Sequence, residues 1–120
     1  MRSTHLRSTN RRRSESEQLD AVFAALSDPT RRTILARLSQ KEFSVTELSE
    51  PLSISMPAVS RHLRVLETAG LISRSKRGRV HYCRVRANEL RYAANWILGQ
   101  RAFWEQQLDA VAHFLEEEQS

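Results

Sequence analysis

The sequence predicts a mainly α-helical fold with one small β-hairpin, in the element order α-α-α-α-β-β-α. Three observations support this prediction. Apolar residues recur at helical spacing before residue 70, and two stretches between residues 71 and 85 alternate in polarity. Residues 88–117 keep one helical pattern, in which Arg101 alone breaks the apolar stripe. The 120 residues include only three glycines and three prolines, and they suffice for one domain with a modest core.

The first two helices are predicted from capping residues and apolar spacing. Ser14 or Ser16 can cap the first helix. Its apolar side chains follow at i, i+3, i+4 and i+7: Leu19, Val22, Phe23 and Leu26. Asp28 is a suitable N-cap for the second helix, and Pro29 suits a first turn that needs no backbone N–H.

The third helix is expected to be short and the fourth to carry two distinct faces. Thr46 can cap the third helix, which should end by residue 52. Ser55 is the expected cap of the fourth helix, which ends at Gly70. Its apolar stripe consists of Val59, Leu63 and Leu66, and its polar stripe consists of Pro57, Ser60, Arg61, Arg64 and Thr68.

The hairpin and the last helix complete the predicted fold. Residues 71–76 and 80–85 alternate as two strands, and Gly78 supplies the conformational freedom for the turn. Residues 88 to about 117 form one long helix whose apolar face is wider than a single packing contact needs. Such a helix on a small domain is expected to pack against a partner chain, so we predict a dimer.

Charge and cysteine content indicate the class of partner. The net charge is +5 and the isoelectric point is about 10.3, which favours nucleic acid first and an anionic membrane surface second. No apolar run approaches the length of a membrane span, and the first residues lack the apolar core of a secretory signal. Cys83 is the only cysteine, which excludes an intramolecular disulfide and favours the reducing cytoplasm.

Residues 1–14 are expected to form a flexible basic arm, and residues 15–117 the folded domain. The first thirteen residues include five arginines and no acid, without any apolar periodicity. The arm either contacts DNA phosphates or contributes only non-specific charge.

The strongest functional signal is a basic helix followed by a basic hairpin. Between Ser60 and Arg86 the chain has eight lysines or arginines and one acid, Glu67. This is the layout of a winged-helix DNA-binding protein, with helix 55–69 in the major groove and wing 74–82 on the adjacent minor groove. The expected contacts are Ser55, Met56, Pro57, Ala58, Ser60, Arg61 and Arg64 on the helix and Lys76, Arg77 and Arg79 on the wing.

Arg61 is the best candidate to read a base, since a guanidinium can bond guanine O6 and N7 together. The alternatives are a solvated charged face, or a winged-helix protein–protein interaction module without sequence-specific DNA binding. His62 lies between the two faces, where it either donates to a backbone carbonyl beneath the hairpin or contacts a phosphate. No nucleophilic triad, phosphate-binding loop or paired-carboxylate cleft is visible, so we predict neither an enzyme nor a cofactor.

Two segments resemble signatures of one protein family. Residues 26–35, LSDPTRRTIL, resemble the L-x-D-P-x-R-x-x-I-L opening of ArsR-type winged helix-turn-helix repressors, and residues 59–72 resemble their V-S-x-H-L-x-x-L-x-x-A-G-L-[IV] recognition helix. The hairpin tip and Tyr82 look like their wing. The resemblance implies a homodimeric repressor that binds an inverted repeat, with repression of its own gene as one alternative. It also places the dimer interface on the first and last helices, at Leu19, Phe23, Ile97, Trp104, Leu108 and Val111.

The resemblance also shows what this chain lacks. Many members of the family sense metals through a cysteine pair at the start of the third helix, and residues 44–50 contain no cysteine. A second family site uses the last helix, where Asp109, His113 and Glu116 share a face, but its Asp-x-His half is missing. We therefore expect a member of the branch without metal ligands. Its effector is not predicted, and the roles of Cys83 and His113 stay open.

Overall fold

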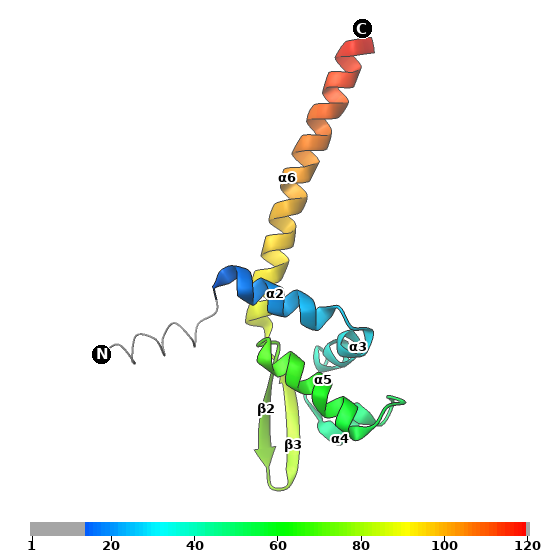
Figure 1. The fold of residues 1–120 in the computed structure, drawn as a ribbon, viewed down its shortest axis with the longest axis vertical. Helices are drawn as coiled ribbons and strands as arrows, with labels where there is room; N and C mark the ends of the chain where they lie inside the picture. Colours follow the sequence, from blue (N-terminus) through cyan, green and yellow to red (C-terminus); the bar gives the residue numbers. More distant parts are fainter. Residues whose placement is uncertain (1–13, 120) are drawn as a thin grey trace, which may run out of the picture. The chain divides into compact units, whose positions relative to one another are not determined.

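A computed structural model describes residues 14–119 (Figure 1). The elements follow in the order α2 (Glu15–Leu26), α3 (Pro29–Leu38), β1 (Phe43–Ser44), α4 (Val45–Ser49), α5 (Met56–Thr68), β2 (Ile72–Arg77), β3 (Val80–Val85) and α6 (Ala87–Gln119). The mainly helical fold with a hairpin and a long last helix is confirmed, and β1 is an addition. The predicted flexible arm lies outside the described residues, except for Ser14.

The chain divides into two compact units, one that ends at Leu90 and one that begins at Arg91. The first unit contains all elements from α2 to β3 together with the first turn of α6. The second unit consists of the remainder of α6. In the described part of the chain, no helix is both long enough and apolar enough to cross a membrane.

The helix starts in the first unit are held by side-chain caps. The Ser14 hydroxyl accepts a hydrogen bond from the Glu17 N–H at 3.1 Å, and Glu17 reaches back to the Ser14 N–H. Asp28 caps α3 by accepting from the Arg31 N–H at 3.0 Å, as expected. The expected cap of the third helix was wrong: Ser44, and not Thr46, caps α4. Ser44 is the cap because Glu47 lies three residues later and completes a capping box, in which its carboxylate accepts a hydrogen bond from the Ser44 N–H at 2.8 Å.

The sheet is antiparallel with the strand order β1-β3-β2. In the hairpin, Arg77 pairs with Val80 across the turn, where Gly78 has a φ of 65°. Strand β1 adds to the outer edge of β3, with Phe43 opposite Cys83 and Ser44 opposite Tyr82. Because Ser44 of β1 also caps α4, strand β1 connects the hairpin directly to that helix.

The core of the first unit lies where α5 packs on α2, α3 and β2. The apolar stripe of α5 is confirmed, since Val59, Leu63 and Leu66 are all 0% exposed. The other fully buried large side chains are Val22, Ile34, Leu48, Leu71, Ile72 and Cys83. Burial of this apolar surface is the main stabilising term of the fold.

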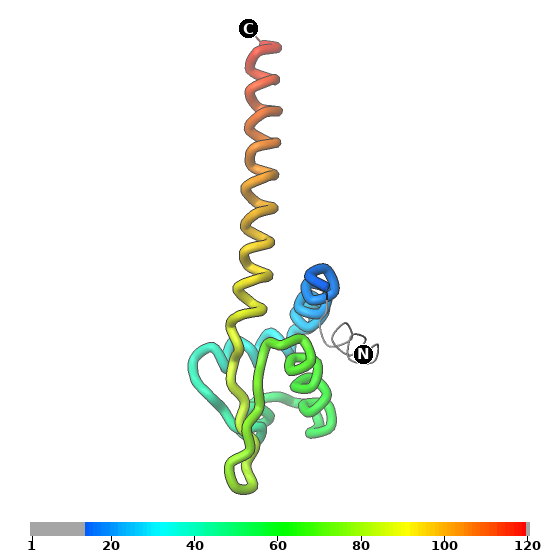
Figure 2. The backbone as a smooth tube through the Cα atoms, turned by 90° about the vertical axis from the view of Figure 1, so that its left-hand side faces the viewer, coloured from blue at the N-terminus to red at the C-terminus, as the bar shows by residue number. Residues whose placement is uncertain are grey.

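Helix α5 ends in a Schellman motif that begins the hairpin. The Leu71 N–H donates to the Leu66 carbonyl at 2.9 Å, and the Gly70 N–H donates to the Glu67 carbonyl at 3.0 Å. Gly70 has a φ of 79°, a conformation that glycine adopts without strain. The motif places β2 beside α5, as Figures 1 and 2 show.

Candidate DNA-binding surface

The N-terminal end of α5 presents small and polar groups to solvent. The Ser55 hydroxyl accepts from the Ala58 N–H at 3.3 Å, and Pro57 lies within the first turn. Met56 is 48% exposed, Ser55 and Pro57 are exposed, and Ala58 is half-buried. A helix end of this kind can approach base edges or phosphates closely, because its side chains are short and its first N–H groups point outward.

The polar stripe of α5 lies opposite its buried stripe, as predicted. Arg61 and Arg64 are exposed, and Ser60 is half-buried. The helix therefore divides into one face that builds the core and another that faces solvent.

A hollow of about 400 Å³ joins the N-terminal half of α5 to the hairpin. Its lining combines Thr46 of α4 with Ser60 of α5 and three cations or potential cations of the hairpin. Those three are Arg74, Arg79 and His81. Hydroxyl and guanidinium donors gathered in one hollow suit a phosphate oxygen.

Sequence reasoning did not select Thr46, Arg74 or His81 as binding residues. Thr46 looked like a helix cap, and the other two lie inside strands whose alternation does not reveal which face is next to α5. Their common position arises from the packing of the hairpin against the helices. For Arg74 and His81, the only sequence signal was the presence of a basic residue in each strand.

The cations of the first unit fall into two groups by their surroundings. Several arginines are held by the protein: Arg31 and Arg32 donate to carbonyls at the end of α2, Arg37 donates to carbonyls of α4, and Arg74 pairs with Glu67 at 3.4 Å. The side chains of the others have no hydrogen-bond or ion-pair partner among residues 14–119: these are Arg61, Arg64, Lys76, Arg79, Arg84 and Arg86. The second group includes four of the cations predicted to contact DNA.

Arg77 differs from the other predicted wing contacts because it has internal partners. Its guanidinium forms an ion pair with Glu42 and lies 3.8 Å from the centre of the Tyr82 ring. The side chain is still 57% exposed. The geometry indicates that Arg77 fixes the hairpin to the segment before β1, in addition to any contact with DNA.

His62 does not lie beneath the hairpin, which was the first of its two expected environments. Its Nδ1 lies 3.2 Å from an Arg31 nitrogen and 3.8 Å from an Asp28 carboxylate oxygen. The ring therefore joins α5 to the junction of α2 and α3, not to the hairpin. The pKa of Asp28 lies below its ordinary value, chiefly because the carboxylate accepts the Arg31 backbone N–H and also because His62 and Arg31 are near.

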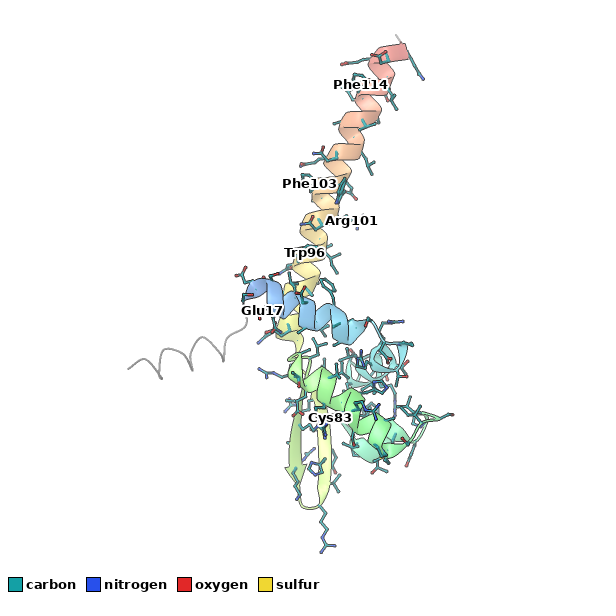
Figure 3. The ribbon with its side chains drawn as sticks, viewed as in Figure 1. Glu17, Cys83, Trp96, Arg101, Phe103 and Phe114 are labelled. Atoms are coloured by element: carbon teal, nitrogen blue, oxygen red, sulfur yellow. The ribbon has the colours of Figure 1, made fainter. Side chains whose placement is uncertain are left out.

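The structure describes the surroundings of Cys83 and His113, whose roles the sequence left open. Cys83 is fully buried in β3, and burial raises the pKa of its thiol, so the neutral form dominates (Figure 3). His113 pairs with Glu117 at 3.1 Å, one turn along α6. Over residues 14–119 no three metal-ligating side chains gather into one group.

The predicted dimer residues divide between the two units. In the first unit, Leu19 and Phe23 of α2 are half-buried. In the second unit, α6 exposes Ile97, Trp104, Leu108 and Val111, each by half or more of its surface. Trp96, Phe103 and Phe114 follow along the same helix and are also exposed (Figure 3). So many large apolar side chains on one exposed helix are typical of an interaction surface.

Comparisons with known proteins agree with this geometry. Residues 26–74 match a family model described as a helix-turn-helix domain. The chain is 36% identical to the transcriptional repressor SdpR of Bacillus subtilis over 67% of this chain and 89% of that protein. It is 32% identical to the transcriptional repressor SmtB of Mycobacterium tuberculosis over 81% of this chain and 64% of that protein.

Solved structures give the same result. The crystal structure of an ArsR family transcriptional regulator aligns with a TM-score of 0.72 and 36% identity, over 78% of this chain and 97% of that one. An ArsR-like regulator from Rhodococcus sp. RHA1 aligns with a TM-score of 0.69 and 35% identity, over 80% and 91% of the two chains.

Proposed function

Because the chain belongs to the ArsR family of winged helix-turn-helix transcriptional regulators, we propose that it represses transcription as a homodimer on an inverted-repeat operator. It is a DNA-binding regulator and not an enzyme. In the proposed complex, each α5 enters a major groove and each hairpin lies along the neighbouring minor groove.

The observation that carries this proposal is the set of unpaired cations on α5 and the hairpin. Arg61, Arg64, Lys76 and Arg79 have no internal partner among the described residues. A guanidinium with no partner in the protein loses no internal contact when it binds a phosphate or a base edge. The hydroxyls of Ser55, Ser60 and Thr46 surround the same region and supply hydrogen-bond donors for the phosphate backbone of DNA.

Within this surface we assign base reading to Arg61 and backbone contact to most of the others. Arg61 lies in the second turn of α5, close enough to the helix start to reach the floor of the groove. Arg64 lies one turn later and suits the phosphate backbone. Lys76 lies near the end of β2 and Arg79 lies in the hairpin turn, and both suit the minor groove.

The test begins with selection of operator duplexes from a random library by the wild-type protein. Fluorescence anisotropy then compares the selected duplex with single-base variants. Arg61→Ala is expected to cost about 1–3 kcal/mol on the selected duplex and to relax the preference at one base pair. Unchanged affinity and unchanged preference would show that α5 does not read the operator.

Salt dependence separates this function from a protein–protein interaction module. DNA binding through phosphates must weaken steeply as salt rises, because bound counterions are released. Footprinting on the promoter region of the chain's own gene would show a two-fold site if the protein represses itself. Duplex binding that ignores both salt and sequence would favour the interaction module.

A further inference from the structure

The hollow of about 400 Å³ beside the hairpin gathers hydrogen-bond donors from three elements. Thr46 belongs to the first turn of α4, Ser60 belongs to the second turn of α5, and Arg74, Arg79 and His81 belong to the hairpin. Within the described part of the chain, no carboxylate lines the hollow. A lining of this composition attracts an anion.

The strand register explains why Arg74 and His81 meet in the hollow. Arg74 is the cross-strand partner of Cys83, and His81 precedes Cys83 by two residues on β3. Cross-strand partners share a face of the sheet, as do residues two apart on one strand. Because Cys83 is fully buried, this face is the one that packs against the helices. Arg84, the next residue of β3, belongs to the opposite face.

The hydroxyls of Thr46 and Ser60 have no hydrogen-bond partner among residues 14–119. Other hydroxyls of the first unit bond a carbonyl one turn earlier, as Thr33 does with Pro29 at 3.0 Å. Ser60 does not make the equivalent bond to Met56, although it lies inside a helix. Both hydroxyls can therefore donate to a group in the hollow without the loss of an internal bond.

Glu67 holds the Arg74 side chain in position. The Arg74 Nε lies 3.4 Å from a Glu67 carboxylate oxygen, and the side chain is only 25% exposed. This Nε is buried and makes no aligned hydrogen bond, and the two terminal nitrogens have no partner among the described residues. The guanidinium is thus largely ordered before a ligand arrives, which lowers the entropic cost of binding.

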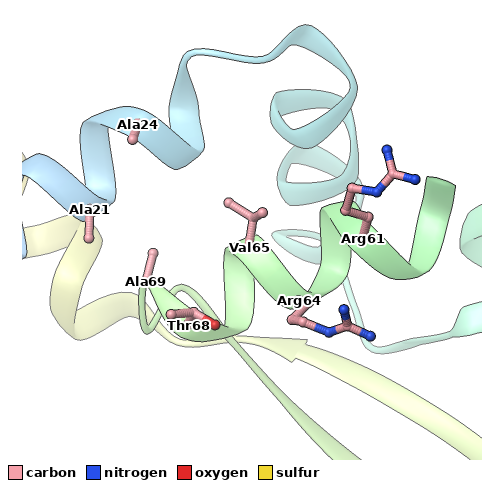
Figure 4. A pocket seen from close by; sticks show the side chains of 7 residues that line it. All are labelled: Ala21, Ala24, Arg61, Arg64, Val65, Thr68 and Ala69. Atoms are coloured by element: carbon pink, nitrogen blue, oxygen red, sulfur yellow. The ribbon is translucent and has the colours of Figure 1, made fainter. Parts of the chain in front are cut away.

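The two arginines of the exposed α5 face are not part of this lining. Arg61 and Arg64 do not line the hollow, and Figure 4 shows that their guanidinium groups extend away from Ala21 and Ala24 of α2. Binding of an anion in the hollow therefore leaves Arg61 available for a base edge.

We propose that the hollow binds one phosphate group of the DNA backbone in each half-site, an assignment that rests on the proposed function. Met56 lines the hollow, so the site is continuous with the exposed start of α5. The phosphate oxygens accept from the two hydroxyls and from the terminal nitrogens of Arg74. The bound phosphate fixes the register of α5 in the major groove, so that Arg61 meets one particular base pair.

Operator duplexes with one neutral methylphosphonate linkage, moved along the backbone, locate this phosphate in anisotropy titrations. In the wild type, the change at the bound phosphate should weaken binding by at least about fivefold. Thr46→Val should weaken binding to the unmodified operator by at least about threefold. In this variant the methylphosphonate at that one position should have little further effect, because both changes remove the same hydrogen bond. Arg74→Gln should show the same reduced effect at the same position.

Thr33→Val and Arg84→Gln are the matched controls. Thr33 is an exposed threonine of α3 outside the hollow, and Arg84 is an exposed arginine on the opposite face of the hairpin. In both variants every methylphosphonate should weaken binding as much as it does in the wild type. Ser60→Ala replaces Thr46→Val if circular dichroism shows that the latter is unfolded.

The loss in Thr46→Val should be equal for the operator and for its single-base variants, in contrast to the loss in Arg61→Ala. A change of base preference in Thr46→Val would overturn the inference, since the hydroxyl would then contact a base. Inorganic phosphate and chloride should release the operator equally at equal ionic strength. A stronger effect of phosphate on the wild type than on Thr46→Val would assign the hollow to a free anion instead.

The inference is also overturned if Thr46→Val and Arg74→Gln reduce the effect of different phosphates, or of none. If Arg61→Ala still changes the base preference in that case, only the phosphate site fails and the proposed function stands. If the wild type binds no selected duplex, both fail together.

Discussion

Arg77 and Arg79 lie two residues apart on one hairpin, yet their charges have different surroundings. Arg77 is neutralised by Glu42 and stacks on Tyr82, whereas Arg79 has no partner among the described residues. An arginine that is already paired releases fewer counterions from DNA than an unpaired one. Substitution of the two residues should therefore affect binding in different ways.

We expect Arg79→Ala to lower the slope of log affinity against log salt by about 1, with a similar loss on all sequences. Arg77→Ala should leave that slope nearly unchanged. Glu42→Gln should raise the slope, because it releases the Arg77 charge toward DNA. Anisotropy titrations at several salt concentrations measure all three. Equal slopes for Arg77→Ala and Arg79→Ala would mean that Glu42 does not neutralise Arg77 in solution.

The lowered pKa of Asp28 predicts how the stability of the fold depends on pH. Its pKa in the folded protein lies below the ordinary value of 3.8, first because the carboxylate caps the Arg31 N–H. A carboxyl group with a depressed pKa stabilises the fold above its unfolded pKa, and this contribution disappears as the pH falls through the folded value. Asp28→Asn keeps a capping side chain but cannot titrate.

The difference in unfolding free energy between wild type and Asp28→Asn should therefore shrink as the pH falls below about 4. Urea titrations at a series of pH values measure this difference. Asp20→Asn is the control, since Asp20 is exposed on α2 and caps no helix. A difference that stays constant down to the lowest pH would contradict the role assigned to the Asp28 charge.

At the scale of elements, the substitutions Gly70→Ala and Gly99→Ala should change the free energy of unfolding in opposite directions. Gly70 ends α5 with a φ of 79°, and an added Cβ would lie 3.1 Å from Glu89 Cγ. Gly99 lies inside α6, where nothing lies within 4 Å of an added Cβ. Gly70→Ala should destabilise the protein by about 1–2 kcal/mol, and Gly99→Ala should stabilise α6 by about 1 kcal/mol.

Chemical denaturation measures both effects, and sedimentation adds a check on Gly99. If Gly99→Ala weakens the dimer, the glycine permits close approach of a second helix. If Gly70→Ala is neutral, the Schellman motif is not needed to start the hairpin.

Local sequence was sufficient to predict most helix boundaries. Asp28, Ser55 and Gly70 act on the chain within a few residues of themselves, so their roles follow from spacing. Strand β1 could not be predicted, because two residues carry no periodicity and their partners lie about 40 residues later, in β3. The choice of Ser44 over Thr46 as cap depended on Glu47, a signal that was present in the sequence but was overlooked.

The candidate site was also predicted only in part, because some of its contacts join residues that lie far apart in the sequence. The exposed face of α5 follows from helical periodicity alone. Glu42, the ion-pair partner of Arg77, and Arg31, the neighbour of His62, lie 35 and 31 residues away along the chain, so neither contact is visible before the fold is known. Thr46, Arg74 and His81 come together only when the hairpin packs beside the helices.

At the scale of the whole molecule, the exposed face of α6 makes a prediction about assembly. Trp104 and Leu108 are 59% and 65% exposed, far more than large apolar residues of a lone folded chain usually are. Trp104→Glu or Leu108→Glu should raise the dimer dissociation constant by at least about tenfold, since each puts a charge into an apolar contact. Sedimentation velocity over a range of protein concentrations measures this constant.

Ala102→Glu is the control for this experiment, because Ala102 lies on the other side of the helix from Trp104 and Leu108 by helical spacing. It should leave the dimer intact. A wild-type protein that sediments as a monomer at micromolar concentration would contradict the proposed assembly. Operator affinity should fall together with dimerisation, since an inverted repeat is bound by two recognition helices at once.

The arginines that face outward from α5 hold no other part of the fold in place. Their replacement therefore has little effect on folding, in contrast to any change at Val59, Leu63 or Leu66 on the opposite side. After gene duplication, a descendant can acquire a new target sequence through substitutions at Arg61 and Arg64 without passing through an unstable ancestor. The scaffold and its regulatory specificity are thus free to evolve at different rates.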